Sequence, residues 1–93
     1  MLRVRGLFAE AEPLSREALE VSRRTLGDDD PDTLMRINDL GMLFSDQGNY
    51  AEAESLYREA LDGLRSALND DDTSTVAVIG NLGDLLRQRG ELV

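Results

Sequence analysis

An internal repeat of 42 residues is the feature that most constrains the fold of this chain. Gly6, Gly48 and Gly90 are spaced at that interval. At the same offset, two further groups of residues recur: Ala9–Glu12 as Ala51–Glu54, and Asp28–Asp30 as Asp70–Asp72. Roughly half of the positions from 6 to 47 are identical to their counterparts, without a gap, which is far above chance. The chain is therefore built from one structural unit that is used more than once.

Each period contains two helical patterns. Apolar residues follow the three-to-four spacing of one helix face from Leu34 to Phe44, and again from Tyr50 to Leu68. The pattern predicts four helices and no strand, near 8–26, 31–47, 50–68 and 73–89. Asp30 before Pro31 is a favourable N-terminal cap. Gly48 and Gly90 suit left-handed helix stops, and the short turns after them predict antiparallel neighbours.

Small residues recur at the positions where two helices would have to cross closely. They are Gly41 and Gly83 on one type of helix, and Ala11, Ala18, Ala53 and Ala60 on the other. A glycine inside a helix costs about 0.5–1 kcal/mol relative to alanine, which close packing can recover. Pro13 does not fit this pattern. We expect it to kink the first helix or to delay its start to about residue 13.

The repeat resembles the tetratricopeptide repeat family. The residues that carry the resemblance are Ile37, Leu40, Gly41, Phe44, Gly48, Tyr50, Ala53, Tyr57 and Ala60. The 42-residue period and the sequence from Gly48 to Leu61 resemble the kinesin-light-chain-like subtype. The resemblance implies an all-α, antiparallel helix-hairpin solenoid whose A helices line a concave groove. It also implies a module that binds a peptide or a partner protein and carries no catalytic residue.

The phase of the repeat predicts four helices in the order B-A-B-A, with one complete repeat at about 31–68. We expect residues 1–93 to form a single segment of about two repeats from a longer array, because solenoids generally need about three repeats. The last helix presents five apolar residues: Val76, Ile79, Leu82, Leu85 and Leu86. Such a face marks an interaction surface. We expect head-to-tail self-association, with the last A helix against the first B helix of the next copy.

The resemblance also indicates which residues line the groove. Its positions correspond to Met35, Asn38, Asp39, Met42, Ala77, Asn81, Asp84 and Gln88, with Arg87 near the rim. Asparagine amides can both donate to and accept from a peptide backbone, and methionine offers an adaptable apolar surface. Because the groove includes Asp39 and Asp84 and the chain carries a net charge of −9, we expect a basic or neutral ligand. The alternative for the same residues is that they are solvated positions without a ligand.

Composition narrows the function further. The chain contains neither cysteine nor histidine, which argues against disulfides, Cys/His metal sites and the usual general base. Its acidity argues against binding to nucleic acid or to an anionic membrane surface. The Asp28–Asp30 and Asp70–Asp72 runs could hold a cation, but they have no calcium-loop spacing and suit helix caps. We therefore predict no enzyme, cofactor or metal site. A cytoplasmic location is the default without cysteine, signal peptide or membrane span.

Two other interpretations stay open from the sequence. The chain could be a structural element that associates with itself, or a truncated fragment with no independent function. Partner binding should compete with a groove peptide, whereas structural stacking should depend on the protein concentration. This difference separates the interpretations experimentally.

Overall fold

The computed structural model describes the backbone of residues 2–69 and 71–92 and the side chains of residues 9–69 and 71–90. Four helices follow one another: α1 (Leu2–Thr25), α2 (Pro31–Asp46), α3 (Tyr50–Ala67) and α4 (Thr73–Leu92). The part of the chain that the structure describes contains no strand. The all-α class and the helix-hairpin arrangement predicted from the sequence are therefore confirmed.

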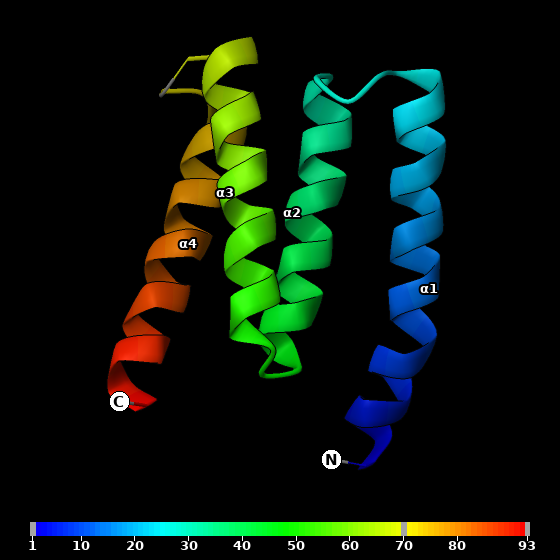
Figure 1. Ribbon diagram of the computed structural model, residues 1–93, viewed down its shortest axis with the longest axis vertical. Helices are drawn as coiled ribbons and strands as arrows, with labels where there is room; N and C mark the ends of the chain where they lie inside the picture. The colour runs from blue at the N-terminus through cyan, green and yellow to red at the C-terminus, as the bar shows by residue number, and fades with distance from the viewer. Residues whose placement is uncertain (1, 70, 93) are drawn as a thin grey trace.

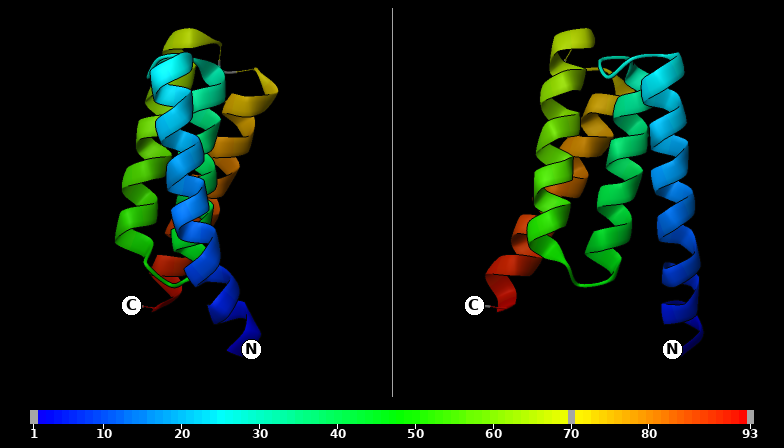
Figure 2. Two further views of the ribbon diagram at one scale, coloured as in Figure 1. Left: turned by 90° about the vertical axis from the view of Figure 1, so that its right-hand side faces the viewer. Right: turned by 45° about the vertical axis from the view of Figure 1, so that its right-hand side comes forward.

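The helices run alternately up and down, so that each is antiparallel to the next (Figure 1). Packing is most extensive between α2 and α3, and α3 packs against α4 and α1 against α2. The helix α2 also contacts α4, so it lies in the groove that α3 and α4 form together. The first turn of α1 and the last turn of α4 lie at the same end of the molecule (Figure 2). Two hairpins thus stack side by side, as the repeat predicts.

Local hydrogen bonds fix the helix ends. The Oδ1 atom of Asp30 accepts a hydrogen bond of 2.9 Å from the backbone N–H of Asp32, and Pro31 occupies the first helical position. Asp72 caps α4 in the same way through the N–H of Ser74, at 2.9 Å. Between α2 and α3, Gly48 adopts a φ of +83°, and the N–H of Asn49 donates to the carbonyl of Phe44. These caps terminate the helices where the sequence predicts.

The core is aliphatic with one buried tyrosine and one phenylalanine. Its buried apolar residues are Leu19, Leu34, Ile37, Leu40, Phe44, Ala53, Tyr57, Ala60, Leu61, Leu64, Val78, Leu82 and Leu85. Most of them come from α2 and α3, so the central hairpin holds most of the buried apolar surface. Two threonine hydroxyls, those of Thr33 and Thr75, are buried among the described residues without a hydrogen-bond partner.

The first helix differs from the prediction. It begins at Leu2 and runs through both Gly6 and Pro13, rather than starting near residue 8 or at the proline. A proline inside a helix removes one hydrogen bond to the carbonyl four residues earlier. That carbonyl belongs to Ala9, and both Ala9 and Pro13 are exposed, so water can satisfy it. The lowest turns of α1 lean away from the axis of the rest (Figure 2).

Two glycine predictions are also wrong. Gly90 does not stop α4, which continues to Leu92, and the only positive-φ glycines are Gly27 and Gly48 among the described residues. Glycine permits a left-handed stop but does not impose one. Gly83 does not lie at a close crossing, because a Cβ atom built on it would meet no atom within 4 Å. The reason is that nothing in the described structure covers this side of α4.

Candidate binding surfaces

The contact between α2 and α3 shows how closely the repeat packs its helices. A Cβ atom placed on Gly41 would lie 2.9 Å from the Tyr57 ring and 3.3 Å from the Cβ of Leu56. A Cβ on Gly63 would lie 2.5 Å from Cδ2 of Leu34. Both glycines therefore sit where a side chain would collide with the neighbouring helix. The small residue predicted at Gly41 is confirmed, and Gly63 supplies a second such position from the other side.

The face shared by α2 and α4, which we call the α2–α4 face, is held by asparagines. Asn81 donates from Nδ2 to Oδ1 of Asn38 at 3.1 Å, and Asn38 donates from Nδ2 to the sulfur of Met42 at 3.8 Å. Asn38 is buried and Asn81 half-buried. Both amides therefore have a structural role, because they join two helices. The sequence placed them in a groove but gave no sign that they bind each other.

The other candidate residues come from both helices. Ala77, Asp84, Arg87 and Gln88 are exposed on α4, and Met42 is exposed on α2. Within this group Arg87 pairs with Asp84 at 3.6 Å, one turn away on the same helix. Both side chains are largely exposed, so the pair contributes little stability. The remaining candidates, Met35 and Asp39, lie seven and three residues before Met42, on the same side of α2, and they also line a pocket against α1.

An open groove runs between α1 and α2, and we call it the α1/α2 groove. Its lining residues are Leu14, Ser15, Ala18, Ser22, Leu26, Asp32, Met35, Arg36 and Asp39. Partial burial raises the pKa of Asp39, while the nearby Arg36 guanidinium lowers it, and burial has the larger effect. The sequence analysis found Met35 and Asp39 but missed the α1 side of this groove. The repeat could have indicated this side, since Leu14, Ser15 and Ala18 occupy the positions equivalent to Leu56, Tyr57 and Ala60.

The helix α4 has one buried side and one exposed apolar side. Val78, Leu82 and Leu85 belong to the core. Val76, Ile79 and Leu86 are exposed, together with Gly83. We call these four residues the α4 face. Of the five apolar residues predicted to form one face, Leu82 and Leu85 are therefore buried against the rest of the chain, and the other three are not.

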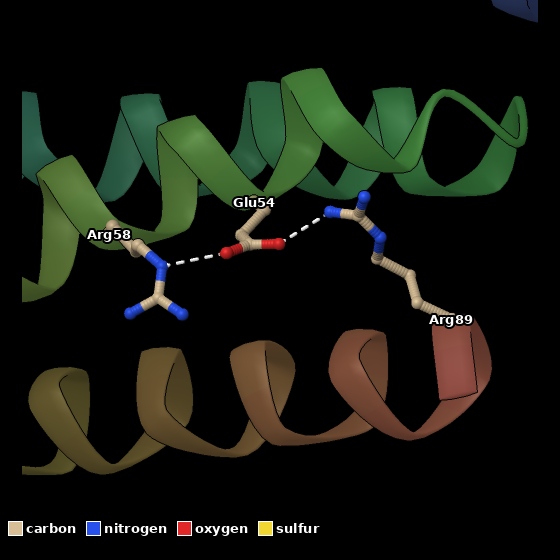
Figure 3. A network of polar contacts seen from close by, with 3 residues as sticks. All are labelled: Glu54, Arg58 and Arg89. Atoms are coloured by element: carbon tan, nitrogen blue, oxygen red, sulfur yellow. Dashed lines mark hydrogen bonds and ion pairs between the residues drawn. The ribbon is translucent and has the colours of Figure 1, made fainter.

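A network of polar contacts joins α3 to α4. Glu54 lies between two arginines: Arg58 Nε donates to one carboxylate oxygen at 2.9 Å, and Arg89 from α4 donates to the other (Figure 3). The hydrogen bond from Arg58 is the main reason why the pKa of Glu54 is lowered. In α1 the same pair recurs as Arg16 and Glu12, at 3.2 Å. The network joins α4 to α3.

The aspartate runs act as caps and surface charges. Asp30 and Asp72 cap helices, and Asp28 lies 3.3 Å from Arg23. Asp70 lies outside the described residues. Within the described ranges, no group of three or more acidic side chains has the geometry to hold a metal ion.

Comparison with known proteins places the repeat in a family. The family model described as tetratricopeptide repeat matches residues 1–66 and, with an overlap, residues 35–92. No similar sequence was found among curated proteins. In the part of the chain that the structure describes, no helix has both the length and the hydropathy needed to cross a membrane.

Proposed function

Because the chain belongs to the tetratricopeptide repeat family, we propose that it binds a segment of a partner protein on the α2–α4 face. Repeats of this family generally mediate protein–protein interaction. The proposed ligand is a basic or neutral peptide, and the chain has no catalytic role in the proposal.

The observation that carries the proposal is the arrangement of α2 and α4. The bond between Asn38 and Asn81 holds the two helices side by side, so the exposed residues beside it keep a fixed spacing. Met42 on α2 and Ala77 on α4 offer exposed apolar contact next to these amides. A partly apolar surface with a few fixed polar groups is the usual form of a peptide-binding site.

Charge supports a basic or neutral ligand over an acidic one. Asp84 is exposed on this face, and the chain carries 19 acidic against 10 basic residues. Arg87 neutralises part of this charge through its contact with Asp84. An acidic peptide would therefore approach against like charge, whereas a basic peptide would be attracted.

A selection from a random peptide library, followed by binding measurements on the enriched peptides, tests the proposal. We expect basic or neutral peptides to be enriched and their binding to be weakened by Asp84→Lys, which reverses a charge, and by Met42→Ala, which removes apolar contact. The control is Ser66→Asp on the exposed surface of α3, which should leave binding unchanged. Tighter binding of an acidic peptide than of its charge-reversed partner at low salt would contradict the proposal.

A structural, self-associating role is the second candidate. It is favoured by the exposed α4 face, because contiguous apolar surface on a small domain marks a contact site.

The 42-residue period also supports a kinesin-light-chain-like subtype and a segment of about two repeats, and both of these remain predictions.

A further inference from the structure

The α4 face repeats a surface that is buried elsewhere in the same molecule. At the 42-residue offset, Val76, Ile79, Gly83 and Leu86 fall on Leu34, Ile37, Gly41 and Phe44 of α2. In α2 these positions are buried, with the three side chains at most 6% exposed. In α4 the corresponding side chains are between 38% and 52% exposed. The same stripe is therefore covered once and uncovered once.

The α1/α2 groove is in turn the open counterpart of the groove that α2 occupies. Leu14 and Ala18 of α1 fall on Leu56 and Ala60 of α3, while Asp39 of α2 falls on Asn81 of α4. Two of these residues of α3 and α4 contact α2. Leu56 lies against Gly41, and Asn81 donates a hydrogen bond to Asn38. The helix α2 is thus seated between α3 and α4, whereas among the described residues no helix is seated in the same way between α1 and α2.

The filled contact between α2 and α3 and the proposed contact between α4 and α1 differ in side-chain size at equivalent positions. One side chain is smaller and its partner is larger. In the filled contact, Leu34 of α2 lies against Gly63, with no space for a larger residue on α3. At the equivalent positions, the α4 face has the smaller Val76 and α1 has the larger Val21. A valine facing a valine replaces a leucine facing a glycine. Such paired changes preserve a contact, because volume lost on one side is filled from the other.

We propose that the α4 face of one copy of this chain docks into the α1/α2 groove of a second copy, head to tail. The docked helix would take the position that α2 takes between α3 and α4. Because the two surfaces differ from each other, each copy keeps one free α4 face and one free groove after docking. The contact is therefore heterologous, and it builds open chains of copies unless the rotation closes a ring.

The proposed contact between copies is weaker than the contact that α2 makes with α3 and α4. The open groove has Arg36 and Asp39 where the filled groove has the buried Val78 and the half-buried Asn81. It also has Ser15 in place of Tyr57. Charges and hydroxyls have to lose water when a helix docks on them, which lowers the affinity. The association is therefore reversible and depends on the protein concentration.

Two single variants and their mixture test the proposal by analytical ultracentrifugation of the 93-residue chain, from micromolar to near-millimolar concentration. Ile79→Glu places a charge on the α4 face and leaves the groove intact. Leu14→Glu places a charge in the groove and leaves the α4 face intact. Both residues are exposed in the single chain, so neither variant is expected to lose helix content, which circular dichroism checks. Gln88→Glu, on another side of α4, is the matched control.

We expect the unmodified chain and Gln88→Glu to form larger species as the concentration rises. Each variant alone stays monomeric, since burying an unpaired carboxylate weakens the contact by about 100-fold or more. An equimolar mixture of Ile79→Glu and Leu14→Glu forms dimers and nothing larger, because one intact groove and one intact α4 face are left.

Other outcomes overturn the proposal. If Leu14→Glu dimerises alone, two α4 faces bind each other instead. If the mixture stays monomeric while the unmodified chain associates, the contact lies elsewhere. If the unmodified chain stays monomeric and folded over the whole range, a second copy does not cover these surfaces. Peptide binding on the α2–α4 face is measured with dilute protein, so its failure is seen separately from a failure of self-association.

Discussion

The helices α2 and α4 carry the same apolar stripe but lie in different surroundings. On α2 the stripe is covered by α3, and the Tyr57 ring lies 2.9 Å from the place of a Gly41 side chain. On α4 the equivalent Gly83 has no atom within 4 Å of that place. A repeated sequence therefore gives repeated surfaces, but a surface becomes core only where a neighbour covers it. The comparison shows that the same residues can be buried on α2 and exposed on α4 in one chain.

The largest difference is expected from substituting the two equivalent glycines. Gly41→Leu should destabilise the fold by about 3 kcal/mol, because the new side chain collides with Tyr57 and Leu56. Gly83→Leu should instead stabilise the fold by about 0.5–1 kcal/mol, since the site is open and leucine is more favourable than glycine inside a helix. Urea denaturation of dilute protein measures both. Equal destabilisation by the two variants would show that α4 is covered in the single chain.

A second test exchanges the filled contact for the pair of side chains found at the open one. Gly63→Val alone should cost about 1–3 kcal/mol, because Leu34 leaves no space for it. Adding Leu34→Val, as at Val76 and Val21, should recover part of this loss. A double-mutant cycle from urea denaturation gives the coupling. Strictly additive effects of the two substitutions would contradict the idea that their volumes compensate.

The extent to which the sequence predicts this molecule follows from the same comparison. The period, the four helices, the Asp30 cap and the Gly41 crossing could be predicted, because they depend on local propensity and on a regular pattern of apolar residues. The extension of α1 to Leu2 could not, since tolerance of Pro13 depends on the exposure of the carbonyl that it frees.

The candidate site was less predictable than the fold. The resemblance identified Asn38 and Asn81 as groove residues, but the two helix positions are 43 residues apart, one more than the period. A comparison at the repeat offset alone therefore does not pair them. Likewise, periodicity assigns Gly83 to a close crossing but does not reveal whether a neighbouring helix is present. Both facts depend on tertiary contacts that a repeat pattern does not encode.

Two buried threonines offer a test at positions where α2 and α4 should behave alike. Thr33 and Thr75 are equivalent in the repeat, fully buried, and have hydroxyls without a partner in the described structure. Thr33→Val and Thr75→Val should each stabilise the fold by about 1 kcal/mol, because valine has the same shape and no polar group to satisfy. Thermal unfolding measures the gain. Destabilisation by either substitution would mean that its hydroxyl has a hydrogen-bond partner.

The smallest effect is expected from the polar network between α3 and α4. Arg58 and Arg89 hold the pKa of Glu54 below its ordinary value of 4.5. A lowered pKa in the folded chain adds stability above the ordinary pKa, and this stability is lost as the pH falls through the folded value. Arg89→Gln should therefore make unfolding less sensitive to pH in this acidic range. Arg87→Gln, at a pair that joins two residues of α4, is the control and should alter the profile less.

The central claim is that the chain contains one filled helix-in-groove contact and, separately, both halves of a second. Amide hydrogen exchange, followed by mass spectrometry at low and at high protein concentration, tests this claim most directly. We expect the amides of α1 and α4 to become better protected as the concentration rises, while those of α3 change little, since α3 is already covered by α2 and α4. Protection that is the same at every concentration, or that rises in α3 and not in α4, would contradict the account.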